Sequence, residues 1–274
     1  MSATQHEKGA RFRALHEGPD VFVIPNPWDV GSSRMLAGLG FQALATSSAA
    51  SACALGKRDG GLSREEALEH ARLIVHATDL PVSADLEKGF GDRPETVAET
   101  VRLAGAVGLV GCTIEDTTGN PERPLFDDQL AIERIAAACE AARALPCPFM
   151  LTARAHNLMY ASPSLDATIR RLQAFEAAGA DVLFAPGLPD LPAVRAVCAA
   201  VSKPVNFMAG IKSKSFSVAE LASAGVRRIS LATSLYRAAM TGFLEAAREV
   251  SDSGEFSFLD RSVATQELLA LMRI

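Results

Sequence analysis

Two carboxylates, Asp85 and Glu87, stand where a short apolar run gives way to a glycine-rich stretch. The run 80–84 is typical of a buried strand, and Gly89 and Gly91 are typical of the loop that follows it. Residues i and i+2 of an extended chain point to the same side, so the two carboxylates lie next to each other. Like charges this close need compensation, and a divalent cation is the common partner of hard oxygen ligands. The pair therefore indicates a metal site, with a solvated strand end as the alternative.

Further charged residues follow other apolar runs. Glu115 and Asp116 form a second acidic pair, and Arg154 and His156 follow the fifth run. If these ends meet, the acids would hold a cation and Arg154 would grip a substrate carboxylate through two parallel hydrogen bonds. Alternatively, Arg154 only neutralises Glu115, and His156 is a hydrogen-bonded interior residue. The other polar candidates in or after such runs are Asn26, Trp28, Asp29, Ser47, Ser48, Lys57, Arg58, Asp59 and Asn206.

These candidates suggest different roles. Ser47 and Ser48 would offer hydroxyl and backbone N–H donors to the oxygens of a bound anion, and Asn206 is a further candidate for substrate contact. Asp29 has an alternative role as the cap of the helix that starts after it. Trp28 has an alternative role in packing, and the charged run 57–59 has one as a solvated loop.

A repeating strand–helix pattern must position these residues. Eight apolar runs, typical of buried parallel strands, alternate with eight stretches of helical periodicity. The runs are 21–24, 43–46, 82–85, 109–114, 149–153, 181–185, 205–208 and 228–232; the helices are 32–39, 64–77, 94–105, 129–144, 166–178, 191–201, 217–224 and 234–251. The pattern predicts one (β/α)8 TIM barrel domain over residues 1–274, with a helical extension over about 235–274. An open doubly wound sheet is the alternative, but no G-x-G-x-x-G follows the first run.

Composition limits the partners and the compartment. The net charge is −5 and no basic cluster is present, which argues against nucleic acid or an anionic membrane as partner. The five cysteines are scattered, and no apolar run reaches the length of a signal peptide or a membrane span. These features predict a soluble cytoplasmic protein. The apolar residues of the segment 255–274 predict that it packs on the barrel or on a second subunit.

Four segments together resemble the isocitrate lyase / phosphoenolpyruvate mutase family. They are the Ser47-Ser48 pair with ALGKRDG, then SADLEKGFGD, TIEDTTGN and LTARAHN, within a likeness that runs over residues 21–233. The resemblance implies a (β/α)8 barrel whose last helix is exchanged between subunits of a homo-oligomer, a dimer or tetramer. It also implies Mg²⁺, or Mn²⁺ in its place, bound together with a small 2-oxo or 2-hydroxy carboxylate.

The resemblance assigns roles by motif. It makes Asp85 the direct metal ligand, lets Glu87 and Glu115 hold the metal through water, and places Asp59 close by. Arg154 would bind the substrate carboxylate and the enolate oxygen, and the other oxygens would be held by Ser47 and the backbone of Ser48. The predicted catalytic residues are therefore Arg154, Asp59 and Glu115; the substrate-binding residues are Ser47, Ser48, Arg154 and Asn206; the metal ligands are Asp85, Glu87 and Glu115.

The loops also depart from the family's lyases, which carry a K-K-C-G-H-type loop whose cysteine protonates the leaving enolate. Here the loops read ALGKRDGG and IEDTTGNPERPLFD, without cysteine or histidine. We therefore expect a phosphonomutase-like branch without the lyase cysteine, acting as a Mg²⁺-dependent lyase or decarboxylase through an enolate. A lyase would need another proton donor, for which Asp116, Lys57 and Tyr160 are candidates. The alternatives are a 2-oxo acid binding protein without turnover, or an enzyme that acts on the P–C bond of a phosphonopyruvate.

Overall fold

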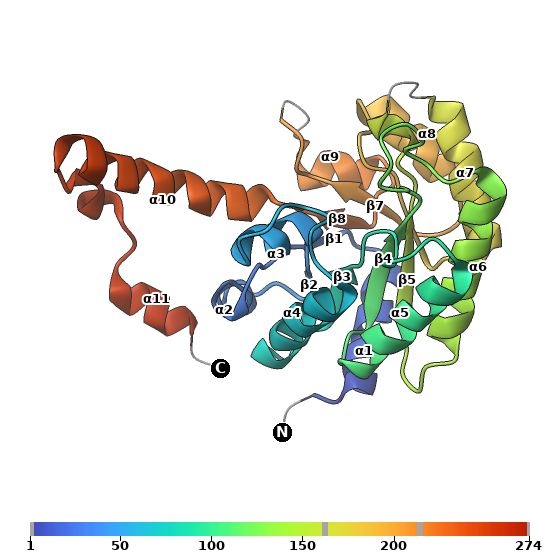
Figure 1. The fold of residues 1–274 in the computed structure, drawn as a ribbon, viewed down its shortest axis with the longest axis horizontal. Helices are drawn as coiled ribbons and strands as arrows, with labels where there is room; N and C mark the ends of the chain where they lie inside the picture. The colour runs from blue at the N-terminus through green and yellow to red at the C-terminus, as the bar shows by residue number, and fades with distance from the viewer. Residues whose placement is uncertain (1–2, 161–163, 213–215, 273–274) are drawn as a thin grey trace.

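The computed structural model describes residues 3–160, 164–212 and 216–272. Its centre is one parallel sheet of eight strands in the order β1-β8-β7-β6-β5-β4-β3-β2 (Figure 1). The strands are β1 (Phe22–Ile24), β2 (Leu44–Ala45), β3 (Val82–Asp85), β4 (Gly111–Glu115), β5 (Met150–Arg154), β6 (Val182–Phe184), β7 (Val205–Met208) and β8 (Arg228–Ser230).

The seam between β1 and β2 completes the ring. There the Ala45 N–H donates to the carbonyl oxygen of Pro25 at 3.1 Å, and the Asn26 side-chain amide donates to the carbonyl oxygen of Thr46 at 3.0 Å. The predicted TIM barrel fold is confirmed by this nearly closed ring and its surrounding helices.

Each predicted helix is present within a few residues of its expected ends. The helices are α2 (Val30–Gly38), α4 (Arg64–Ala77), α5 (Pro94–Ala106), α6 (Asp128–Arg143), α7 (Leu165–Ala177), α8 (Leu191–Ala200), α9 (Val218–Ser223) and α10 (Ser234–Ser253). Local chemistry sets their starts: Ser63 and Glu66 form a reciprocal capping box on α4, and Pro94 occupies the first turn of α5.

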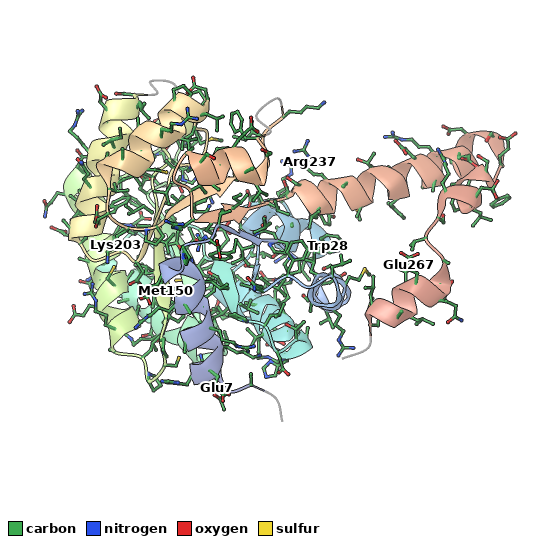
Figure 2. All side chains as sticks on the ribbon, turned by 180° about the vertical axis from the view of Figure 1, so that it is seen from behind. Glu7, Trp28, Met150, Lys203, Arg237 and Glu267 are labelled. Carbon is green, nitrogen blue, oxygen red and sulfur yellow. The ribbon has the colours of Figure 1, made fainter. Side chains whose placement is uncertain are left out.

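An N-terminal helix, α1 (Gln5–Glu17), was not predicted. It closes the end of the barrel opposite the carboxyl ends of the strands, where Phe12 forms an apolar cluster with Phe22, Met150 and Val182. In Figure 2, α1 lies beside the labelled Met150. Since these side chains are almost wholly buried, this end of the barrel is sealed by packed carbon.

The C-terminal extension leaves the barrel. Figure 1 shows α10 pointing away from the sheet, followed by the turn η2 (Ser257–Arg261) and by α11 (Thr265–Leu271). The helix α11 returns to contact α2, but no residue of α10 is buried, and Phe243 is 63% exposed. The chain thus continues in helical segments beyond the last strand, and residues 273–274 of the predicted extension lie outside the described residues. No helix in the described part of the chain has the length and apolar character needed to cross a membrane.

Candidate active site

A cavity of about 220 Å³ opens at the carboxyl ends of the strands. Parallel strands point alternate residues inward, so residues far apart in the sequence meet in its wall. The predicted site residues that line it are Ser47, Ser48, Asp59, Asp85, Arg154 and Asn206. The structure thus brings these predicted substrate and metal residues into one place.

Arg154 connects the two acidic strand ends. Its Nη1 lies 3.5 Å from the Asp85 carboxylate and 3.3 Å from the Glu115 carboxylate. The pairing register explains the second contact, because Glu115 on β4 lies directly beside Arg154 on β5. The Arg154 guanidinium also lies over the ring of Phe184, 5.0 Å from its centroid, while its buried Nε has no hydrogen-bond partner among the described residues. Arg154 therefore pairs with Glu115, as the alternative interpretation held, and one of its buried donors is left without a partner among the described residues.

Glu87 lies in a tightly held turn after β3. Its φ of +51° is unusual for a residue with a side chain, and its N–H donates to the Asp85 carboxylate at 3.2 Å. The turn is fixed from outside by the buried Arg134 of α6, which donates to the carbonyl oxygens of Gly91 at 2.7 Å, Asp92 at 2.6 Å and Lys88. Sequence reasoning missed Arg134, whose only signal is a basic residue at an inward-facing position of its helix.

The acidic cluster carries negative charge that its neighbours do not fully compensate. Burial raises the pKa of Glu87 to about 7, helped by the charges of Asp85, Asp59 and Glu115. Burial also raises the pKa of Glu115 to about 7, against the lowering effect of Arg154. Carboxyl groups that resist ionisation in this way are stabilised as anions by a nearby cation.

The donor set fits a hydrated divalent cation. In the described part of the chain, no group of three or more His, Cys, Asp or Glu side chains is arranged to hold a metal by itself. Mg²⁺ does not require such a group, since it keeps several waters and is often bound by one or two carboxylates and the substrate. Asp85, which lines the cavity, suits direct contact, and the more distant Glu87 and Glu115 suit contact through water.

Ser47 and Ser48 begin α3 (Ser48–Ala54), a short helix where we had expected only a loop. The Ser47 hydroxyl accepts from the N–H of Ala50, and the Ser48 hydroxyl donates to the Asp85 carboxylate at 3.3 Å. Ser48 therefore contacts the acidic cluster, and Ser47 lines the same cavity. Asn206 is fully buried and accepts a 2.8 Å hydrogen bond from the Nε of Arg228, a residue that sequence reasoning did not single out.

Two of the proton-donor candidates are already engaged. The buried Asp116 carboxylate accepts from Arg171 at 2.7 Å and from the backbone N–H of His156 at 2.9 Å. Lys57 forms a 2.5 Å ion pair with Glu66, and the two side chains are 40% and 42% exposed. Tyr160 is 38% exposed and its ring lies 6.3 Å from that of His156.

Three other candidates make contacts that indicate structural roles. Burial, with the charge of Arg154, lowers the pKa of His156 to about 2, so this interior histidine is neutral. Asp29 caps α2 through a reciprocal capping box with Ser32, as the alternative interpretation held. The Trp28 ring packs edge-on against Tyr236 at 5.5 Å.

Comparison with known proteins places the chain. The family model for phosphoenolpyruvate phosphomutase matches residues 12–251. An oxaloacetate decarboxylase of Ectopseudomonas mendocina is 30% identical over 254 residues, covering 90% of this chain and 86% of that protein. The 2-methylisocitrate lyase of Escherichia coli is 30% identical over 243 residues, covering 85% and 81%. A candidate lyase/mutase from Burkholderia cenocepacia J2315 superposes with a TM-score of 0.94 and 49% identity, covering 97% and 95%. This chain belongs to the phosphoenolpyruvate mutase/isocitrate lyase family, whose members are lyases and mutases acting on C–C or P–C bonds.

Proposed function

We propose that the protein is a Mg²⁺-dependent lyase or decarboxylase that cleaves a C–C bond in a small 2-oxo or 2-hydroxy carboxylate through an enolate. The observation that carries the proposal is the position of Arg154, with Nη1 between the Asp85 and Glu115 carboxylates at the wall of the cavity. A cation site and a guanidinium side by side can hold a 2-oxo acid by its carboxylate and its keto oxygen.

Each residue has a role in this proposal. Asp85 would hold the cation directly, and Glu87 and Glu115 would hold its water ligands; Mn²⁺ could take the place of Mg²⁺. When bound, the cation would polarise the keto group as a Lewis acid. Arg154 would donate to the substrate carboxylate and to the oxygen on which negative charge develops, and Ser47 and the backbone of Ser48 would orient the remaining oxygens.

Asp59 completes the set from the edge of the cavity. It is exposed, and its charge contributes to the raised pKa of Glu87. We propose that it extends the acidic shell around the cation rather than touching the substrate. Asn206 would contact the substrate from the wall that it lines.

The occupied proton donors favour decarboxylation over retro-aldol cleavage. Asp116 and Lys57 are both held in ion pairs, which leaves Tyr160 as the remaining candidate. Loss of CO₂ from a 2-oxo diacid such as oxaloacetate needs no acid at the bond that breaks, because the electron pair passes into the enolate. The enolate carbon can then take its proton from water.

A substrate panel tests the proposal. Oxaloacetate, methylisocitrate and phosphonopyruvate are each assayed for pyruvate release with Mg²⁺ and again with a chelator. We expect chelator-sensitive release that Asp85→Ala abolishes together with Mg²⁺ binding, measured by calorimetry. Activity that survives Asp85→Ala would contradict the metal assignment. Release from phosphonopyruvate alone would favour P–C chemistry, and tight binding of 2-oxo acids without release would favour a binding protein.

We also propose that the exposed α10 packs against a second copy of the chain, as an exchanged helix in a dimer or tetramer. Its support is the set of exposed apolar side chains on the extension, namely Phe243, Leu244, Val250, Phe256 and Leu259. Light scattering of the native protein should give a mass that is a multiple of 28.9 kDa. A monomer at micromolar concentration would contradict the proposal.

A further inference from the structure

A second arginine lies inside the barrel, beneath the proposed site. Arg228, the first residue of β8, is only 4% exposed. Its Nη1 donates to the Thr152 hydroxyl at 3.0 Å and its Nε to the Asn206 side chain at 2.8 Å. Thr152 precedes Arg154 by two residues on β5, so the Arg228 guanidinium lies one layer deeper, about 7 Å further down the barrel.

Among the described residues, every hydrogen-bond partner of this guanidinium is neutral. The third contact is from Nη1 to the Nε2 of His16, at 3.4 Å. The Nδ1 of His16 donates to the carbonyl oxygen of Phe12 at 2.8 Å, which leaves Nε2 as an acceptor. Burial, with the charge of Arg228, lowers the pKa of His16 to about 3, so the imidazole adds no charge. The ion pairs of the described residues do not include Arg228.

Burying a guanidinium without an anionic partner inside a barrel lowers the stability of the fold. Barrel interiors are usually packed with branched apolar residues, and a buried cation without an anion is destabilising unless something compensates it. Arg154 cannot share its partners with Arg228, since Asp85 and Glu115 already pair with it at the layer above. Arg228 therefore holds a positive charge that the described part of the chain does not balance.

The cavity reaches this charge. Arg228, Asn206, Ser230, Thr113 and Ser83 all line the same space as Asp85 and Arg154. The lower wall is thus made of hydroxyl and amide groups around a guanidinium, which suits the far end of an anionic ligand. A ligand held at Arg154 by one carboxylate would bring a second carboxylate down to Arg228.

We propose that Arg228 binds the distal carboxylate of a dicarboxylic substrate and so selects dicarboxylates over monocarboxylates. The proposal rests on the proposed function for the position of the 2-oxo or 2-hydroxy acid end. It also predicts a kinetic signature. A carboxylate that leaves as CO₂ loses the charge that Arg228 holds, so Arg228 stabilises the bound substrate more than the transition state. Arg228 is a specificity residue, and its loss raises KM for oxaloacetate without lowering kcat.

Malate and lactate form a matched pair for the test, because both are 2-hydroxy acids and only malate has the distal carboxylate. Their Kd values are measured by calorimetry with Mg²⁺, for the native protein and for Arg228→Met, which keeps the side-chain length and removes the charge. We expect native protein to prefer malate by at least about tenfold and Arg228→Met to lose that preference while binding lactate unchanged. Equal loss of both ligands, or a preference that survives, would overturn the proposal.

A second variant covers the case in which Arg228→Met does not fold. Asn206→Asp leaves Arg228 in place and gives its guanidinium an internal carboxylate at the 2.8 Å contact. It should remove the malate preference in the same way, and a retained preference would overturn the proposal. A free inorganic anion at Arg228 is a different outcome. Malate and lactate would then bind equally, and chloride would raise the Tm of native protein but not of Arg228→Met, which also overturns it.

The calorimetric result does not depend on turnover. If no substrate of the panel is consumed but the malate preference is present and is lost in Arg228→Met, the proposed function fails and the assignment of Arg228 stands. If substrates are consumed with Mg²⁺ and malate has no advantage over lactate, the assignment of Arg228 fails alone.

Discussion

The acidic cluster should contribute more stability to the metal-free protein at pH 6.5 than at pH 8, measured relative to a variant that lacks its two glutamates. Folding raises the pKa of Glu87 and of Glu115 from 4.5 to about 7. The folded state therefore binds their protons more tightly than the unfolded chain does. By linkage, the stability that these protons confer is absent above the folded pKa and is gained as the pH falls through it. At pH 8 both groups are charged, and the free energy needed to keep two buried carboxylates ionised lowers the stability of the folded state.

The size of the effect follows from the two pKa values. A group whose pKa is about 7 when folded and 4.5 when unfolded gains about 0.8 kcal/mol between pH 8 and pH 6.5. Glu115 is well buried and should contribute in full, whereas solvent screening reduces the share of the less buried Glu87. The total is about 1 kcal/mol, or about 2 °C in Tm for a chain of this length.

Thermal melts of chelator-treated protein between pH 8 and pH 6.5 measure this gain, with the double variant Glu87→Gln/Glu115→Gln as control. The buried His16 and His156 have lowered pKa values, so each costs about 0.4 kcal/mol of stability between pH 8 and pH 6.5 and offsets part of the gain. Both proteins carry this cost, so the gain is the difference between their two pH profiles. Mg²⁺ should raise the Tm more at pH 8 than at pH 6.5, because protons compete with the metal. Parallel profiles for the native protein and the variant would refute the reasoning.

Three further substitutions test single contacts. Arg154→Lys should weaken binding of 2-oxo acids at least about tenfold with little change in Tm, because lysine cannot make two parallel hydrogen bonds; calorimetry with unchanged affinity would remove Arg154 from the site. Asp116→Asn should lower the unfolding free energy in urea by about 3 kcal/mol, because it leaves the buried Arg171 with only the exposed Asp128 as its anion; a loss below about 1 kcal/mol would show that Asp128 alone compensates and would contradict this. Arg134→Met should both destabilise the fold and weaken Mg²⁺ binding, since the turn that it fixes carries Glu87; stable protein with native Mg²⁺ affinity would contradict this.

The barrel could be predicted because strands and helices differ in the spacing of their apolar residues and in the residue types at their ends. The apolar run before Asp85 and the capping residues of α4 are local signals that survive in the fold. The helix α1 escaped prediction because its polar and apolar residues show little periodicity along the helix. The capping box of Thr4 and Glu7 was its one local signal. The short helix α3 was also missed, although Ser47 caps its start, because seven residues carry too little periodicity to distinguish a helix from a loop.

The site could be predicted where chemistry and strand position coincide. Asp85 and Arg154 end strands, so their meeting followed from the fold alone. Arg228 starts a strand, at a place where polar residues are not expected to reach the site, and only its inward direction and length bring it to Thr152. Whether a given arginine is paired with an acid or with neutral groups depends on distances that sequence spacing does not encode. That difference distinguishes Arg171, which is bound by Asp116, from Arg228.

The apolar seal formed by Phe12, Phe22, Met150 and Val182 has a consequence for traffic through the barrel. Small molecules cannot pass between tightly packed rings and methyl groups, so the described residues leave the cavity open only on the side where the strands end. The products must therefore leave by the same route through which the substrate entered. When one substrate is cleaved into two products inside the barrel, the product nearer the mouth would leave first. The deeper product would leave last and would compete with the next substrate molecule for the site.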